Sequence, residues 1–382
     1  MKREKLQVFS QQPLHERRKS SSVGERGWRR RRFKRSEDTE VGAALADMPT
    51  LLLVGTIKGS LNDVMYGVLN PTVDAMRLKS SYVGDKFAAC AVLATLFKPT
   101  KREPFRSHTL KWLEGDHPYI FRPIVKNRDF VFMEATGFTQ LADGEAVGYH
   151  VMHSVTFPGA CPMNGNIRAH MAVCAFYRQL SDGVVEVFTK TTANPGGHVA
   201  PGIAVKYGAT ALMSAQNLAD CAQAKKLAWM TARFGRSTST TSTTSTASTT
   251  SSSSSNRISH LPIRARHNVN VRVCFNCEER VSLLSRRDLC SLCSRSSCSA
   301  CNVKKELSFI SKDGSLLKHN MRFCGACIKD VMNLDARVIA CEEFGASRSE
   351  DNPRRSRLTA HLEGLTASDP NVVVLRPSVL GS

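Results

Sequence analysis

The stretch that decides the fold of one part of the chain reads Cys274-Phe-Asn-Cys277, Cys290-Ser-Leu-Cys293-Ser-Arg-Ser-Ser-Cys298-Ser-Ala-Cys301 and Cys324-Gly-Ala-Cys327. It holds eight of the thirteen cysteines as four C-x-x-C pairs, which are separated by twelve, four and twenty-two residues. Two cysteines at this spacing can bind one metal ion from a single tight turn, and eight thiolates supply two tetrahedral four-cysteine sites. We therefore predict that these eight cysteines hold two structural zinc ions. A disulfide framework is the alternative interpretation.

The net charge of +20 is concentrated near the start of the chain, where residues 1–35 hold thirteen Lys and Arg against three Glu. A basic chain favours phosphate-rich partners, either nucleic acid or anionic lipid head groups. The run Trp28–Arg35 predicts a nuclear-import signal, a polybasic membrane tether or a solvated tail without a partner. The sequence shows no apolar signal segment near Met1 and no apolar run long enough to span a membrane. These features predict a cytoplasmic protein whose contact with membranes is peripheral.

Composition divides the chain into five parts. Ser237–Ser255 is almost purely Ser and Thr, so it cannot bury apolar surface and is typical of a flexible linker. We expect a basic disordered tail at 1–42, a globular domain at 43–235, a linker at 236–267, a cysteine-rich module at 268–345 and a disordered tail at 346–382.

The globular part predicts an antiparallel sheet followed by a helix. Thr50–Ile57 is typical of a strand, and Ser60 is a candidate N-cap for a helix over 61–70. The apolar run 86–97 fits either type of element. Further strands are predicted at 119–125, 129–135, 146–156, 169–180 and 184–191, with Asp-Gly or Asn-Gly turns at several links.

The sheet is predicted to end at Asn194-Pro-Gly-Gly-His198, after which Pro201 can open one long helix over 201–231. An apolar stripe along this helix would lie on the sheet, formed by Leu212, Ala215, Ala219 and Ala222. A long helix closing a curved antiparallel sheet is a helix-grip arrangement, and it can enclose a cavity for a ligand. The predicted fold class is therefore α+β.

Several short motifs in 45–232 resemble those of the START lipid-binding domains. Asn127-Arg-Asp-Phe-Val131 resembles a strand that often carries Arg-Asp-Phe in that family, and Tyr149–Val155 with Phe157-Pro158 resembles the strand after it. Asn194-Pro-Gly-Gly-His-Val-Ala-Pro201 is similar to the family's turn before its last helix, although Asn194 stands where the family has Asp. The resemblance implies a helix-grip fold that holds one hydrophobic ligand, such as a sterol or phospholipid. A helix-grip fold with a filled core is the alternative.

The cysteine-rich module resembles the FYVE finger, in which four C-x-x-C pairs occur in the same order. That family binds its two zinc ions in a crossed manner. By resemblance, one ion would be held by Cys274, Cys277, Cys298 and Cys301, and the other by Cys290, Cys293, Cys324 and Cys327.

The module departs from the FYVE pattern at the residues that read phosphatidylinositol 3-phosphate. Arg286-Arg-Asp-Leu-Cys290-Ser291 keeps two arginines, but Asp288 and Leu289 replace two histidines and Ser291 replaces the last arginine. By resemblance, the remaining head-group contacts would be Arg286, Arg287 and Arg322. The membrane-inserting loop of the family would correspond to Val281, Leu283 and Leu284, which could equally be core residues of a small domain.

Two functions fit these features. The first is a non-enzymatic lipid-binding or transfer protein, with a hydrophobic ligand in the START-like domain and peripheral contact with an anionic membrane, such as the endosomal one. The alternative is an adaptor whose divergent finger binds a protein rather than a phosphoinositide. Nucleic-acid binding is not expected, because residues 268–345 carry twelve basic against nine acidic side chains and few aromatic ones. The sequence contains none of the nucleotide-binding, hydrolase or metalloprotease motifs, so we do not expect an enzyme.

Overall fold

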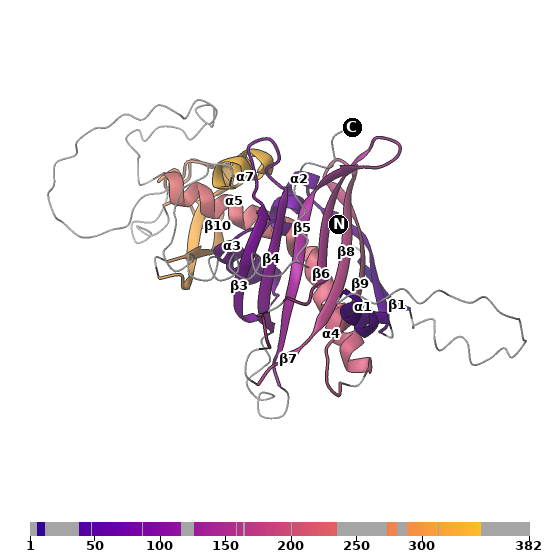
Figure 1. Cartoon of the computed structure of the whole chain (residues 1–382). Coiled ribbons are helices and arrows are strands. Elements are labelled where there is room, and N and C mark those ends of the chain that lie inside the picture. The colour runs from indigo at the N-terminus through magenta and orange to yellow at the C-terminus, as the bar shows by residue number, and fades with distance from the viewer. Residues whose placement is uncertain are drawn as a thin grey trace, which may run out of the picture. The chain divides into compact units, whose positions relative to one another are not determined.

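The computed structural model describes residues 6–11, 38–115, 126–234, 273–280 and 289–344, except for 47, 86, 158, 163–164, 200 and 312. The predicted strand at 119–125, the Ser/Thr-rich linker and the C-terminal tail lie outside these residues. The chain divides into two compact units (Figure 1). Residues 1–219 with 340–382 form the first, here called the sheet unit, and residues 220–339 form the second, the cysteine unit.

The sheet unit is built on one nine-stranded sheet, in which every pairing is antiparallel except that of β5 with β7. Its path runs β1-β2-β9-β8-β6-β5-β4-β3, with β7 beside β5. The strands are β1 (Gln7–Gln11), β2 (Thr50–Lys58), β3 (Phe87–Phe97), β4 (Ser107–Gly115), β5 (Arg128–Gln140), β6 (Ala146–Ser154), β7 (Ile167–Arg168), β8 (His170–Ser181) and β9 (Val184–Asn194).

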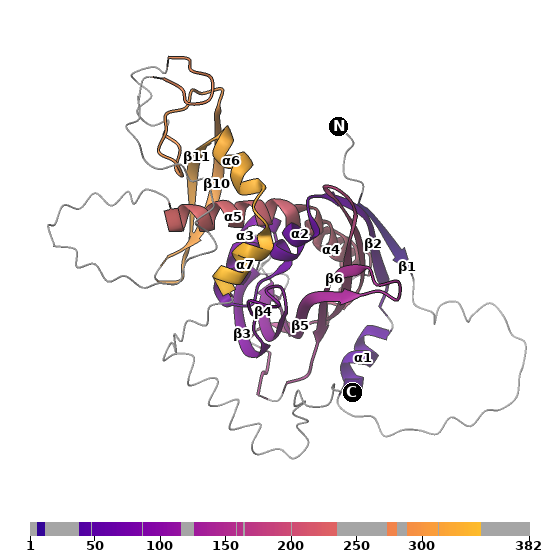
Figure 2. The same cartoon turned by 90° about the horizontal axis from the view of Figure 1, so that it is seen from above.

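Helices α2 (Leu61–Val68), α3 (Val73–Val83) and α4 (Pro201–Met213) of the same unit lie on one side of the curved sheet (Figure 2). Helix α1 (Asp38–Ala46) lies apart from them, near β8 and β9. After α4, the 3-10 turn η3 (Ser214–Asn217) leads into α5 (Leu218–Phe234), which belongs to the cysteine unit from Asp220 onward. Helix α2 packs on β6 and β8, and α4 packs on β1, β2 and β9. The Ser60 hydroxyl caps α2 by accepting a hydrogen bond from the Asp63 N–H.

The predicted α+β fold with a large antiparallel sheet and a following helix is confirmed. The run 86–97, which sequence left open, forms β3. The single helix predicted over 201–231 is instead two helices joined by η3. Side chains stabilise this break, because the Ser214 hydroxyl donates to the Ala211 carbonyl at 2.7 Å and the Asn217 amide donates to the Val83 carbonyl at 3.2 Å.

Two of the START-like motifs meet in the sheet unit. Asp129 is fully buried, and its carboxylate accepts two hydrogen bonds from Arg168, one from Nε at 3.1 Å and one from a terminal nitrogen at 3.0 Å. Its second oxygen also accepts the Trp112 indole N–H at 3.0 Å. The neighbouring Arg128 donates to the Pro195 carbonyl at 3.2 Å. The Arg-Asp-Phe strand therefore anchors both β7 and the turn that precedes α4.

The cysteine unit contains a β-hairpin and a short helix. Strands β10 (Asn302–Ile310) and β11 (Leu316–Cys324) pair antiparallel, and α6 (Gly325–Met332) follows directly. A last helix, α7 (Ala336–Phe344), begins in this unit and ends in the sheet unit. Among the described residues, no helix is both long and apolar enough to cross a membrane.

One close approach in the sheet unit requires a glycine. A Cβ added to Gly67, in α2, would lie 2.1 Å from the Leu218 carbonyl oxygen at the start of α5. Such a contact can be relieved only by moving backbone. Gly202, in α4, offers a matched comparison, because a Cβ there would meet nothing within 4 Å.

We expect Gly67→Ala to lower the free energy of unfolding by about 1–3 kcal/mol, the usual effect of overpacking a helix contact. Gly202→Ala should instead leave it unchanged or raise it by up to about 1 kcal/mol, since Ala is the better helix former. Urea denaturation of both variants and the parent chain measures the difference. Equal effects of the two substitutions would contradict the proposed packing of α2 against α5.

Candidate metal centres and a buried polar cluster

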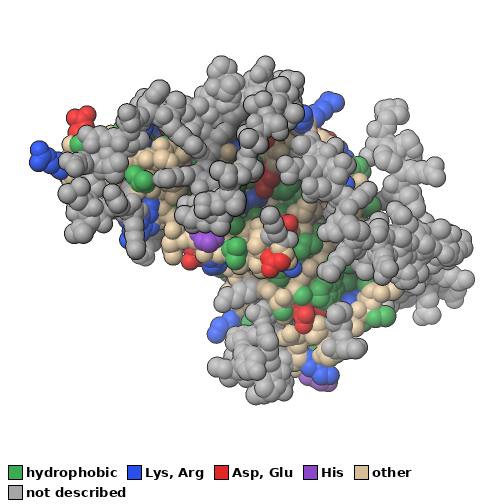
Figure 3. Space-filling view, turned by 90° about the vertical axis from the view of Figure 1, so that its left-hand side faces the viewer, with side chains coloured by type: hydrophobic (Ala, Val, Ile, Leu, Met, Phe, Trp, Pro, Cys, Tyr) green, Lys and Arg blue, Asp and Glu red, His purple; other side chains and the backbone are tan. Residues whose placement is uncertain are grey.

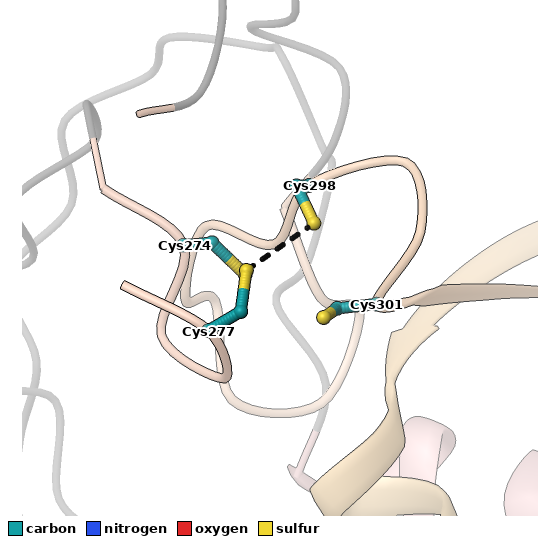
Figure 4. Close-up of side chains that lie close together, drawn as sticks. All are labelled: Cys274, Cys277, Cys298 and Cys301. Carbon is teal, nitrogen blue, oxygen red and sulfur yellow. Dashed lines mark hydrogen bonds between the residues drawn. The ribbon is translucent and has the colours of Figure 1, made fainter. Parts of the chain in front are cut away.

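The first group of four cysteines gathers two segments that are distant in sequence (Figure 4). The sulfur atoms of Cys274, Cys277, Cys298 and Cys301 all lie within 4.8 Å of one another. The Sγ atoms of Cys277 and Cys298 are 3.6 Å apart. Cys301 immediately precedes β10, so this group connects the segment that holds Cys274 and Cys277 to the hairpin.

The second group joins a different pair of segments. Cys290 and Cys293 meet Cys324, the last residue of β11, and Cys327 in α6, again with all four sulfurs within 4.8 Å. The Sγ atoms of Cys293 and Cys324 are 3.8 Å apart. A tetrahedral ion with Zn–S bonds of about 2.3 Å would place its four sulfurs about 3.8 Å from one another. Both groups therefore have the dimensions of a four-thiolate zinc site.

The backbone around the two N-terminal pairs repeats one conformation. In the first, the Glu278 N–H donates to the Cys274 carbonyl at 2.9 Å, and in the second the Ser294 N–H donates to the Cys290 carbonyl at 2.8 Å. Glu278 and Ser294 have φ angles of 61° and 58°, and among described non-glycine residues only these two have positive φ. Left-handed backbone is unfavourable for such residues and is usually held in place by surrounding structure. A metal ion bound by the preceding cysteines would supply that constraint.

In each group the pKa of some cysteines is lowered and that of their neighbours is raised, because the sulfurs share hydrogen bonds with one another. Burial opposes ionisation of Cys274, but backbone N–H groups of Cys298, Cys277 and Asn276 lower its pKa to about 6. The neighbouring thiols of Cys293, Cys324 and Cys327 lower the pKa of Cys290. All thirteen cysteines are free thiols, which argues against the disulfide alternative. Each group can hold a metal ion such as zinc, and four sulfur ligands would leave no position for water.

The cysteine unit also contains a hollow of about 450 Å³ beside β11. Its lining is half polar and half apolar, formed by Leu289, Ser291, Phe309, His319, Asn320, Met321 and Arg322. Of the residues predicted to contact a lipid head group, the structure places Arg322 in this lining. Arg286 and Arg287 lie outside the described residues, as do the predicted membrane-loop residues Val281, Leu283 and Leu284.

A second polar site, which sequence reasoning missed, lies on the inner face of strands β4, β5 and β6. The Lys111 ammonium is buried and donates at 2.7 Å to both the backbone carbonyl and the side-chain oxygen of Asn70. It also forms a salt bridge with Glu134, whose other oxygen lies 2.7 Å from Nε2 of His150. A carboxylate only accepts hydrogen bonds, so Nε2 of His150 carries the hydrogen in this contact.

The cluster is ionised in an unusual way for a protein interior. Burial alone would raise the pKa of Glu134, but the Lys111 ammonium and the His150 ring hold it well below its ordinary value. Burial lowers the pKa of His150, and the Lys79 and Lys111 cations lower that pKa further. The Glu134 carboxylate raises it, but this offsets the lowering only in part. The ring is therefore neutral at pH 7, and the cluster is a Lys–Glu ion pair extended by a neutral histidine.

Buried polar side chains cluster on the inner face of these three strands, which they share with apolar residues such as Phe132 and Met152. Directly opposed residues on neighbouring strands share a face, and the register places seven buried polar side chains together: Ser107, Thr109, Lys111, Glu134, Thr136, His150 and Ser154. Most have partners; the Thr136 hydroxyl, for example, donates to the Phe105 carbonyl at 2.8 Å. The Thr109 hydroxyl is completely buried and has no hydrogen-bond partner in the described part of the chain. An ordered water or a bound polar group would satisfy such an atom.

Comparison with known proteins gives matches among solved structures. The human StarD13 (DLC2) lipid transfer and protein localization domain matches with 18% identity over 45% of this chain and 75% of its own, at a TM-score of 0.33. Human StAR-related lipid transfer protein 5 matches with 12% identity over 46% of this chain and 76% of its own, at a TM-score of 0.35. A STAR-related lipid transfer protein fragment from Xanthomonas axonopodis matches with 18% identity over 46% of this chain and 84% of its own, at a TM-score of 0.32. No protein-family model and no curated protein matches the sequence. The likeness concerns the fold alone.

We expect the purified chain to contain two zinc ions. Replacing Cys290 and Cys293 together by serine should leave one bound zinc ion. Replacing Cys274 and Cys277 together should also leave one, because each pair supplies two of the four ligands of a different site. Elemental analysis combined with native mass spectrometry counts the ions. Cys161→Ser is the control, since Cys161 is exposed and belongs to neither group. Loss of both ions from either double variant would contradict two separate centres.

We expect the stability of the sheet unit to fall as the pH drops from 7 to 5. The folded-state pKa of His150 is lowered, so below about 6.5 the unfolded chain takes up a proton that the folded chain resists. Glu134, whose pKa is also lowered, should add a further loss below about pH 4.5. His150→Gln should flatten the dependence between pH 6.5 and 5, whereas His198→Gln, at an exposed position, should not. Urea denaturation at each pH provides the measurement, and parallel slopes for His150→Gln and the parent would refute the assignment.

Proposed function

We propose that the sheet unit binds one hydrophobic lipid and that the chain is a non-enzymatic lipid-binding or transfer protein. The observation that carries this proposal is the buried polar face of β4, β5 and β6. A sheet face covered by helices is ordinarily apolar, since each buried polar group must find a partner. Here buried polar side chains stand beside Phe132 on three adjacent strands, and among the described residues the Thr109 hydroxyl has no hydrogen-bond partner.

The chemistry of this face favours a ligand that is mostly apolar and has a small polar group. Lys111 and Glu134 neutralise each other, so the face carries little net charge. The Thr109 hydroxyl, opposite Glu134 in the register, can donate to or accept from a hydroxyl or carbonyl group. Buried apolar side chains of α2, among them Val64, Met65 and Leu69 beyond its end, lie inside the same unit. The START-like motifs of 127–131 and 194–201 support the same class of ligand.

The cysteine unit is proposed to hold two zinc ions and to provide peripheral contact with a membrane or a protein. Arg322 and Ser291 in the hollow beside β11 are its candidate contacts. A nucleic-acid partner is not proposed. On the face shown in Figure 3, the Lys and Arg side chains of the described residues are scattered among acidic and hydrophobic ones rather than gathered in a patch.

The test separates ligand binding from stability by comparing two buried threonines. Thr109→Val removes a hydroxyl without a protein partner, so it should not lower stability but should weaken binding of a fluorescent sterol or phospholipid by about 3- to 10-fold, the value of one hydrogen bond. Thr136→Val removes a hydroxyl bonded to the Phe105 carbonyl, so it should lower stability by about 1 kcal/mol and leave affinity unchanged.

The measurements are fluorescence titration and urea denaturation of the full chain, with mass spectrometry of lipid that co-purifies with it. The absence of any bound lipid and of any titratable affinity would refute the carrier function. Binding that is equally weakened by both substitutions would refute the place of Thr109 in the site while leaving lipid binding intact.

A further inference from the structure

Helix α5 is covered along most of its length. From Cys221 to Thr231, every residue is buried or half-buried. Its first two residues, Leu218 and Ala219, belong to the sheet unit, and the part from Asp220 onward belongs to the cysteine unit.

Side chains of α5 form part of the hydrophobic core of the cysteine unit. Leu227 and Met230 are 1% and 2% exposed and join a core whose other members come from the hairpin, α6 and the segment before them. These other members are Cys290, Leu292, Leu307, Phe323, Cys324, Ile328 and Val331. The hairpin, α6 and the segment before them thus lack a complete core of their own, because α5 supplies two of the nine buried core residues.

A buried charge fixes the same contact. Lys226 is 1% exposed, and its ammonium donates to the Leu334 carbonyl at 2.6 Å and to the Met332 carbonyl at 3.4 Å. These carbonyls lie at and just beyond the end of α6, where the partial negative charge of a helix end favours a cation. An ammonium group is costly to bury without such partners. The pairing of α5 with α6 is therefore specific in position as well as apolar.

The two cysteine groups differ in their relation to this core. Cys290 and Cys324 are members of it, and Cys293 and Cys327 pack against it. None of Cys274, Cys277, Cys298 and Cys301 belongs to the core or to the residues packed against it. A small metal module owes much of its folding free energy to its ion. Only the ion bound by the Cys290 group would be coupled directly to α5.

We propose that the Cys290 centre is a metal-dependent clamp on α5. When it is loaded, it holds the hairpin and α6 around Leu227 and Met230; when it is empty, this part of α5 loses its cover. Coupling between two equilibria is reciprocal, so weakening the α5 contact also weakens retention of this ion. The Cys274 centre stabilises its own loops and leaves α5 protected. This inference does not depend on lipid binding.

The test is hydrogen exchange of the full chain, followed by mass spectrometry. The variant Cys290→Ser with Cys293→Ser should exchange the amides of 222–233 about 5- to 150-fold faster than the zinc-loaded parent, the range of ordinary coupling. The matched variant Cys274→Ser with Cys277→Ser should leave these amides within about 2-fold of the parent, below that range. Peptides from β5 and β6 report global unfolding and should not change. Unchanged protection of α5 in the first variant, or equal effects of both variants, would overturn the proposal.

A second measurement tests the clamp with substitutions in α5, so that the result does not depend on whether the cysteine variants fold. Lys226→Met and Leu227→Ala should speed zinc release to a chromogenic chelator for one of the two ions, by about 5- to 150-fold. Lys329→Met, an exposed position on α6, is the control and should release both ions as the parent does. Parent-like release from both α5 variants would refute the clamp, as would acceleration of both ions together.

Discussion

Four thiolates within 4.8 Å of one another would repel strongly unless a cation lay between them, and the cysteine unit brings four cysteine sulfurs this close twice. Apart from α5, its described residues offer one hairpin and two short helices, and its apolar core includes Leu227 and Met230 of α5. The left-handed backbone at Glu278 and Ser294 becomes tolerable only when the cysteines beside it are fixed. Because each group joins segments that are distant in the chain, two bound ions would together define how this unit folds.

The sheet unit depends on a different electrostatic balance. Lys111 and Glu134 would each be expensive to bury alone, and they are stable inside the sheet because Asn70 and His150 complete their hydrogen bonds. Apolar residues could fill the same space more simply. A polar arrangement on the inner face of β4, β5 and β6 makes physical sense when the face must also accommodate something polar that is not part of the protein. The network therefore connects the way the sheet is stabilised with the function proposed for it.

How much could be read from sequence depended on whether the signal was local. The C-x-x-C pairs and the Ser60 cap are local patterns; the structure gathers the cysteines into two groups of four and caps α2 with Ser60, whereas the grouping of the pairs was expected only from the family resemblance. The polar face could not be found in this way, because a lysine or glutamate in a strand ordinarily indicates the solvent side. Only the register of β4, β5 and β6 shows that Lys111 and Glu134 point inward. Strand β1 was missed for a similar reason, since its pairing with β2 is the only evidence for it within the basic tail.

Helix α5 shows why composition and packing divide the same chain at different points. The Ser/Thr tract after residue 236 is a change of composition, whereas contacts divide the chain between Ala219 and Asp220, inside a continuous helix. From the sequence, Lys225 and Lys226 would be expected on the solvent-exposed side of the helix, yet both are almost fully buried. Lys226 is buried because the carbonyls after α6, more than a hundred residues later in the chain, need a donor. These contacts join segments that are distant in the chain but lie in one unit, so no local pattern of the sequence could indicate them.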